Sequence, residues 1–204
     1  MSNFIVMDCE TAALPIEQLN VPEFTPDSRL KDEVKIKADL EKKKSEWLES
    51  CALRAESARV LVIGFLDQDG QESFLEGEEK GILELFWKVY SEAKAPMVGH
   101  YIKGFDIPMI IRRSWLNGIV PRGTMAGRYL NPDRFIDTME AWQCGNNRDT
   151  ISLDNLSKAL KVGAKNGEGK DFALLYSKDR EAALSYLRND LRLTQKCASR
   201  MGLI

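Results

Sequence analysis

The sequence predicts an α/β fold built on a mixed β-sheet. Short apolar runs typical of buried strands recur along the chain and, from residue 78 onward, alternate with segments whose apolar residues follow helical spacing. Two strands joined by the tight turn Asp69-Gly70 precede this alternation and predict an opening hairpin. An antiparallel start followed by alternating strands and helices indicates that parallel and antiparallel pairs share one sheet.

Length and charge bound the class of protein. The chain has 204 residues, enough for one domain, and its 29 Lys and Arg against 31 Asp and Glu leave a net charge of −2. That balance argues against a protein that wraps nucleic acid by charge alone, although an acidic site can coexist with a basic rim. No apolar run approaches the length of a membrane span, and no secretion signal is evident. The four cysteines are scattered and there is one histidine, so we expect no zinc site, no membrane partner and a cytoplasmic location with reduced thiols.

The first predicted strand is the apolar run Phe4–Met7, which ends in Asp8-Cys9-Glu10. Because side chains alternate across a strand, Asp8 and Glu10 share one face and Cys9 points to the other. Two neighbouring carboxylates at the end of a buried strand repel each other and resist desolvation, and a divalent cation such as Mg²⁺ or Mn²⁺ relieves both costs. The alternative is an ordinary strand end whose acids face water, which is the commoner case for an isolated Asp-x-Glu.

An insertion of about residues 17–57 is predicted between the first two strands. It begins with an irregular, proline-containing stretch, and residues 28–57 then become strongly charged and helix-favouring, which predicts one or two helices that project from the domain or lie across it. We expect one apolar edge of this segment to pack on the domain or on a partner near the first strand. Lys42–Lys44 could contact phosphates, and a solvated helix face is the alternative. The apolar edge is predicted from near-helical spacing of Leu40, Trp47, Leu48, Cys51 and Ala55.

The other elements follow from local signals. Ser152 is a plausible N-cap, Pro108 is tolerated in a first helical turn, and a glycine-containing flexible loop is expected at 165–170. Strands are expected at 60–66, 71–75, 96–99 and 135–138, and helices at 78–93, 107–116, 152–160 and 179–201.

Acidic side chains recur at two helices. Tyr186 and Asp190 lie four residues apart and share a helix face beside an apolar stripe, where an unpaired acid is costly. A structural ion pair is the alternative for Asp190, although Arg188 and Arg192 point around the helix. Asp106 opens a helix, where the helix dipole favours a negative side chain, and a plain N-cap is the alternative there.

Three motifs carry a resemblance to a known family. They are Asp8-Cys9-Glu10-Thr11, then Gly104-Phe105-Asp106-Ile107-Pro108 followed by Arg112-Arg113, and finally Tyr186-Leu187-Arg188-Asn189-Asp190. In order, spacing and context they resemble the tyrosine-bearing DEDDy branch of the DEDD superfamily of 3′–5′ exonucleases, most of all the exonuclease domain of family B DNA polymerases and stand-alone prophage-type exonucleases. The resemblance spans nearly the whole chain, so residues 1–204 are expected to form a single 3′–5′ exonuclease domain. One departure is Tyr101, at a position where the family usually carries Asn.

The resemblance implies a ribonuclease H-like fold, with a five-stranded mixed sheet flanked by helices. It implies that four acids hold two divalent metal ions, Mg²⁺ or Mn²⁺, and that Tyr186 orients the attacking water. Lys103 and the Arg112-Arg113 pair are candidate phosphate contacts, with scaffold salt bridges as the alternative for the arginines, and Asp137 is a candidate supporting acid. The implied metal ligands are Asp8, Glu10, Asp106 and Asp190, and the candidate substrate-binding residues are Thr11, Tyr101, Lys103 and Phe105.

The expected activity is metal-dependent hydrolysis of phosphodiester bonds from the 3′ end of single-stranded DNA. Two ions about 3.5–4 Å apart activate the attacking water and stabilise the leaving 3′ oxygen, and the acids supply the charge that holds them. One alternative is a 3′–5′ exoribonuclease, since no residue identifies a contact to the 2′-hydroxyl. The other is a nucleic-acid binding or scaffold protein that keeps the fold without the chemistry. Single-stranded nucleic acid is the expected partner, with replication, recombination or repair as the expected context.

Overall fold

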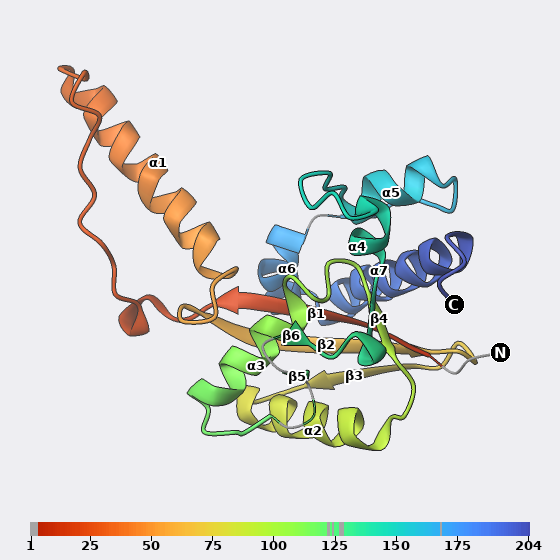
Figure 1. Ribbon diagram of the computed structural model, residues 1–204. Helices are drawn as coiled ribbons and strands as arrows, with labels where there is room; N and C mark the ends of the chain where they lie inside the picture. Colours follow the sequence, from red (N-terminus) through yellow and green to blue (C-terminus); the bar gives the residue numbers. More distant parts are fainter. Residues whose placement is uncertain (1–3, 122, 124, 127–128, 168) are drawn as a thin grey trace.

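The computed structural model describes residues 4–121, 123, 125–126, 129–167 and 169–204. Its centre is a five-stranded sheet in the order β3-β2-β1-β4-β7 (Figure 1). β1 pairs antiparallel with β2 and parallel with β4, so the sheet is mixed, as the sequence predicts. The antiparallel pair of β2 with β3 and the parallel pair of β4 with β7 complete it. The strands are β1 (Ile5–Ala13), β2 (Ala58–Asp67), β3 (Glu72–Glu76), β4 (Met97–Gly99) and β7 (Phe135–Asp137).

Helices cover both faces of the sheet. Apolar side chains of α2 and α3 pack with Met7, Cys9 and their neighbours on one face, whereas α6 and α7 pack with Val6 and Val62 on the other. The expected fold class, a ribonuclease H-like mixed sheet flanked by helices, is thus confirmed. These helices are α2 (Glu79–Glu92), α3 (Asp106–Leu116), α6 (Phe172–Lys178) and α7 (Arg180–Arg200).

The last helix, α7, forms where its apolar positions recur at helical spacing. Asp179 caps it, because its side chain accepts a hydrogen bond from the backbone N–H of Ala182. Its buried face carries the two residues singled out in the sequence, Tyr186 and Asp190, between leucines that pack on the sheet. The helix therefore carries its acid and its phenol to the face of the sheet toward which Val6 points.

Gly64 of β2 lets α7 approach the sheet closely. Gly64 pairs with Asp8 across the β1–β2 ladder. A Cβ atom at this position would lie 3.0 Å from side-chain carbons of Leu187 and Leu191. Because there is no Cβ, the leucines pack directly on the backbone beside Asp8, and the helix that carries Asp190 is brought near that carboxylate.

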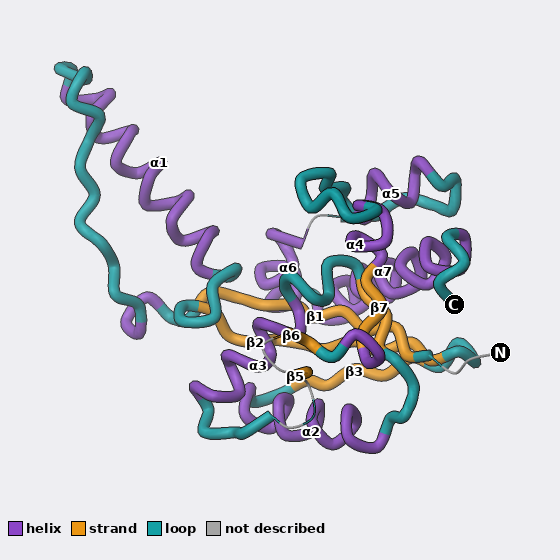
Figure 2. Tube along the Cα trace, viewed as in Figure 1, coloured by secondary structure: helices purple, strands orange, loops and turns teal. Residues whose placement is uncertain are grey.

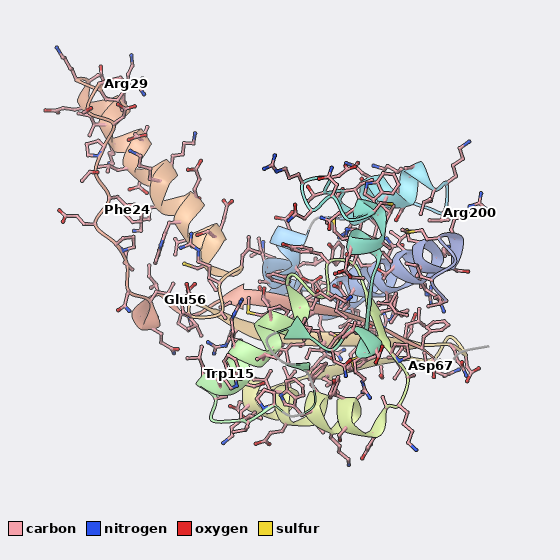
Figure 3. The ribbon with its side chains drawn as sticks, in the orientation of Figure 1. Phe24, Arg29, Glu56, Asp67, Trp115 and Arg200 are labelled. Atoms are coloured by element: carbon pink, nitrogen blue, oxygen red, sulfur yellow. The ribbon has the colours of Figure 1, made fainter. Side chains whose placement is uncertain are left out.

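The insertion between β1 and β2 forms an arm, residues 19–51. An extended stretch leads away from the sheet and α1 (Glu33–Cys51) leads back, and Figures 1 and 2 show the two lying side by side and projecting from the body. Phe24 of the extended stretch meets Trp47 of α1 edge to face, with ring centroids 6.0 Å apart (Figure 3 labels Phe24 and, at the far end, Arg29). The predicted apolar edge therefore packs partly on the arm itself, while Cys51 is buried where the arm joins the domain.

A buried ion pair fixes the chain where the arm meets the body. Arg113 of α3 donates two hydrogen bonds, 2.6 and 2.8 Å long, to the carboxylate of Glu79 of α2 and a third, 2.9 Å long, to the carbonyl of Ala55. Glu79 in turn accepts hydrogen bonds from the backbone of Val60 and the side chain of Asn117. Of the two alternatives for Arg113, the structure favours the scaffold salt bridge over a phosphate contact, because its guanidinium is buried and engaged.

Several short elements were not anticipated. α4 (Thr138–Gln143) directly follows β7, and α6 occupies a segment before the last helix for which the sequence predicted no element. The other small elements are η1 (Ile16–Gln18), the two-stranded β5 (Met125–Ala126) and β6 (Tyr129–Leu130), η2 (Pro132–Arg134) and η3 (Gly169–Asp171), while α5 (Leu153–Ala159) matches an expected helix. Part of the expected loop at 165–170 is the short helical turn η3, and Glu168 within it lies outside the described residues. Within the described part of the chain, no helix has the length and hydrophobicity to cross a membrane.

Candidate active site

The acids of β1 lie on the face covered by α7. Strand alternation places Asp8 and Glu10 toward α7 and Cys9 toward the opposite core, as the sequence predicts. The pairing of β1 with β2 shifts register between Glu10 and Thr11, which is the signature of a β-bulge. The bulge interrupts the ladder directly after the second carboxylate, and pairing resumes with Thr11 opposite Val60. Glu10 is buried and Asp8 is half-buried, and both line a cleft.

Three carboxylates meet at this point. One oxygen each of Asp8, Glu10 and Asp190 lie within 4.8 Å of one another. Two come from the first strand and one from the last helix. The i, i+4 spacing on α7 sets Tyr186 one turn before Asp190, and both are buried. The structure thus assembles three of the four predicted ligands into one cluster.

Burial and mutual repulsion raise the pKa values of this cluster. Desolvation and the charge of Asp190 raise the pKa of Asp8 to about 6. Desolvation and the neighbouring charge of Asp8 raise the pKa of Glu10 well above its ordinary value, and desolvation also raises that of Asp190. A cation bound among the three oxygens would offset both causes, because it supplies the opposite charge that the buried carboxylates lack.

Lys165 is the one cation that touches the cluster among the described residues. Its ammonium pairs with Oδ2 of Asp190 and lies 4.9 Å from the centre of the Tyr186 ring. Its charge lowers the pKa values of Asp8, Glu10 and Asp190 but does not overcome desolvation. Sequence reasoning missed this residue, because Lys165 lies in a polar glycine-containing segment where nothing distinguishes it from a solvated lysine.

Asp106, the fourth predicted ligand, lies beside the cluster and outside the 4.8 Å group. It is the first residue of α3 and is buried, and its Oδ1 accepts a 2.9 Å hydrogen bond from the backbone N–H of Cys9. Asp106 is therefore not a cap of its own helix. It is tied to the strand between the two other carboxylates, and desolvation with the charge of Asp8 raises its pKa well above the ordinary value.

The donor set fits a hard divalent cation. Carboxylate oxygens are the preferred ligands of Mg²⁺ and Mn²⁺. Oδ1 of Asp190 and the hydroxyl of Tyr186 are both buried, and neither has a hydrogen-bond partner among the described residues. Buried polar atoms without partners are rare in folded proteins and call for an ion or a water. The three clustered carboxylates therefore form a group that could hold a metal ion.

Asp137 holds the loop that precedes α3. Its carboxylate accepts hydrogen bonds from the backbone N–H groups of Tyr101 (2.9 Å) and Lys103 (3.0 Å), and it also caps α4 through Met139. The candidate supporting acid therefore positions the backbone of this loop. Tyr101 has a φ of 62°, a left-handed conformation that is unusual for a bulky residue and that Asn adopts more easily. A Cβ on Gly104 would lie 2.2 Å from the Tyr101 ring, so glycine is required there while the ring keeps this position.

The candidate substrate-binding residues lie around the cluster in different roles. Thr11 does not present a free hydroxyl, because its Oγ1 donates a 2.7 Å hydrogen bond to the carbonyl of Ala52 at the end of the arm. Lys103 pairs with Glu140 at 2.5 Å. Phe105 precedes α3 and packs against a small cluster that includes Met109. Tyr101 is the most open of the four, with 47% of its surface exposed.

His100 is fully engaged by its neighbours. One ring nitrogen lies 2.9 Å from the hydroxyl of Thr138, and the other lies 2.9 Å from the carbonyl of Ile151. Burial lowers the pKa of the imidazole. Because both nitrogens have partners, His100 is a structural residue next to the site, and Tyr186 remains the neutral group nearest the carboxylates.

The four acids, Tyr186, Lys165 and most of the candidate substrate-binding residues line one cleft of about 740 Å³. Its acidic end is formed by the carboxylates with Lys165 and Tyr186. Its other end is formed by small and apolar side chains of β1 and by residues at the end of the arm. The members of that second end are Ala12, Ala13, Leu48, Glu49, Ser50, Ala52 and Leu53.

Comparison with known proteins supports the fold. The chain is similar in structure to the family B DNA polymerase from the hyperthermophilic archaeon Pyrobaculum calidifontis, with a TM-score of 0.64 and 16% sequence identity. The match covers 98% of this chain and 24% of the polymerase chain, so the present protein spans about a quarter of that enzyme. No protein-family model matches the sequence, and a search among curated proteins found no significant match. At this level of identity the similarity shows that this chain and part of the polymerase chain share an α/β fold.

Proposed function

We propose that the protein is a metal-dependent 3′–5′ exonuclease that removes nucleotides from single-stranded DNA. The observation that carries this proposal is the meeting of Asp8, Glu10 and Asp190 within 4.8 Å, next to the buried ring of Tyr186. It is supported by the resemblance of the three sequence motifs to the DEDDy exonucleases. The fold shared with part of a family B DNA polymerase is consistent with it.

The chemistry follows from the charges in the cleft. A pair of divalent ions held there would supply Lewis-acid activation of water and stabilisation of the leaving oxygen. Asp8, Glu10 and Asp190 would hold those ions, with Asp106 adding negative charge beside them in the same cleft. Water attacks the phosphorus of the terminal diester, a new P–O bond forms, and the bond to the 3′ oxygen of the preceding nucleotide breaks. The products are a nucleoside 5′-monophosphate and a strand shortened by one nucleotide with a free 3′-hydroxyl.

Tyr186 positions the attacking water and does not remove its proton. Burial and the nearby charges of Asp190 and Glu10 raise the pKa of the phenol far above its ordinary value, so the hydroxyl keeps its proton at neutral pH. A protonated hydroxyl that has no partner among the described residues can donate a hydrogen bond to, or accept one from, a water next to the carboxylates. Its contribution is orientation.

The experiment incubates the purified protein with 5′-labelled single-stranded DNA, duplex DNA and RNA of the same sequence, in Mg²⁺, in Mn²⁺ and in excess chelator. We expect a ladder that shortens from the 3′ end of the single-stranded DNA, only with metal. Asp190→Asn should abolish it, while Glu84→Gln, the same kind of change on the exposed face of α2, should leave it intact. Cleavage of RNA in preference to DNA would identify an exoribonuclease, and binding without any cleavage would identify a scaffold protein.

A further inference from the structure

The arm contributes a wall to the catalytic cleft. Its last turn and the turn that follows, residues 48–53, are called the arm root here. The arm root is fixed to the strand that carries the acids, because Thr11 donates its 2.7 Å hydrogen bond to the carbonyl of Ala52. Cys51, which also belongs to the arm root, is buried. Figure 1 shows α1 returning to the body at the end of β1. An inserted segment thus borders the site directly.

The side chains that the arm root offers to the cleft include two leucines. Leu53 is 65% exposed, although it lines the cleft, and Leu48 is half-buried in the same wall. They join Ala12 and Ala13, which follow the acids on β1. At about 3.3 Å per residue, Ala12 lies about 7 Å along the strand from Glu10. The wall therefore begins beside the carboxylates, next to the place where the terminal bond would be cut.

The charges of the arm do not favour phosphate. Lys42 pairs with Glu46 at 3.7 Å, and Lys43 pairs with Asp39 at 2.8 Å and donates to the carbonyl of Thr25. Between residues 27 and 51 the sequence has seven basic and seven acidic side chains. Their fields cancel at a distance. The part of the arm that can add affinity for a strand is therefore its apolar root.

We propose that the arm root is a base-binding wall, in which Leu53, together with Leu48, contacts the face of an unpaired nucleobase close to the bond that is cut. The inference rests on the proposed function. Every base has an apolar face that can pack on such a surface regardless of sequence. In a duplex those faces are covered by stacked neighbours, whereas the bases of a single strand can turn them toward protein. The wall therefore selects single strands by their bases and not by their phosphates.

The test pairs Leu53→Ala with an oligonucleotide that lacks the relevant bases. Two 5′-labelled strands are used, one natural and one with abasic residues at its last three positions, and kcat/KM is measured for the first cleavage of each. On the natural strand the kcat/KM of Leu53→Ala should be lower than that of the wild type, by about 4-fold if the base covers one methylene of Leu53 and by about 50-fold if it covers three. On the abasic strand it should equal the wild type. Leu116→Ala is the matched control, because Leu116 is 61% exposed on α3 and does not line the cleft.

The outcomes separate this inference from the function on which it rests. Leu53 is largely exposed, so its truncation leaves the fold intact. An equal loss on both strands, or no loss on the natural one, overturns the wall. If the wild type cuts nothing, the proposed function fails, and binding of the same two oligonucleotides by fluorescence anisotropy still decides the inference. A weaker affinity of Leu53→Ala for the natural strand alone supports it, and equal affinities overturn it.

Discussion

Asp8→Asn should make the metal-free protein more stable while removing its response to metal. The pKa of Asp8 is raised from 3.8 to about 6 in the folded protein, so folding disfavours its charge. Above about pH 6 this penalty is fully present. It fades as the pH falls through 6 toward 4, because the native carboxyl takes up its proton before the unfolded one does.

The size of the effect follows from that shift. A shift of about two pKa units corresponds to about 3 kcal/mol at neutral pH. Asp8 is only half-buried, and solvent in the cleft screens part of the repulsion, so we expect about 1–2 kcal/mol. For a chain of this length each kcal/mol raises Tm by about 2–4 °C, which gives an increase of about 2–8 °C.

The assay is thermal unfolding followed by circular dichroism, at about pH 7.5 and about pH 4.5, in chelator and in saturating Mg²⁺ or Mn²⁺. In chelator the stability advantage of the variant over the wild type should be full at the higher pH and should shrink to about a third at the lower pH, which lies between the folded and unfolded pKa values of Asp8. Metal at about 100 times its Kd should stabilise the wild type by about 2.7 kcal/mol and the variant by much less. Glu84→Gln serves as the control. A difference of the same size at both pH values, or an equal response of both proteins to metal, would refute the assignment of Asp8 to a repulsive metal-binding cluster.

Two further outcomes are expected. Tyr186→Phe should keep its packing and lower kcat by about 10- to 1000-fold with little change in substrate binding. Single-turnover kinetics would measure both quantities. A rate equal to that of the wild type would exclude a positioning role for the hydroxyl. Changing Lys42–Lys44 to Glu tests whether the arm contacts phosphate. Because Lys42 and Lys43 already form ion pairs, we expect the salt dependence of single-strand binding to keep its slope, and a flatter slope would show that the arm does contact phosphate. Trinucleotides should be cut at the normal rate in either case.

Local periodicity was enough to predict much of the fold and the core of the site. Strand alternation placed Asp8 and Glu10 on one face, and helical spacing placed Tyr186 next to Asp190, because both patterns depend only on backbone geometry. Contacts between distant segments could not be predicted in this way. Lys165 pairs with an acid on a different element, and nothing in its own segment indicates this.

Other differences have the same origin. Asp106 looks like a helix cap in the sequence, yet its partner is the N–H of Cys9, almost one hundred residues away. The hydroxyl of Thr11 is bound by the carbonyl of Ala52, a group that every residue possesses and that carries no sequence signal. Short elements such as α4 and α6 escaped prediction because one or two turns contain too few residues to reveal a period.

The close packing of α7 on Gly64 has a consequence for folding. The carboxylates of β1 and the carboxylate of α7 are separated by about 180 residues of chain, and they meet only after the last helix has docked on the opening hairpin. Contacts this distant in sequence form late, because the entropy of closing the loop is spent before the contact exists. A partly folded or still-growing chain therefore lacks a complete cation site. If the proposed function holds, cleavage reports the final docking step, and folding intermediates of the protein have no nuclease activity.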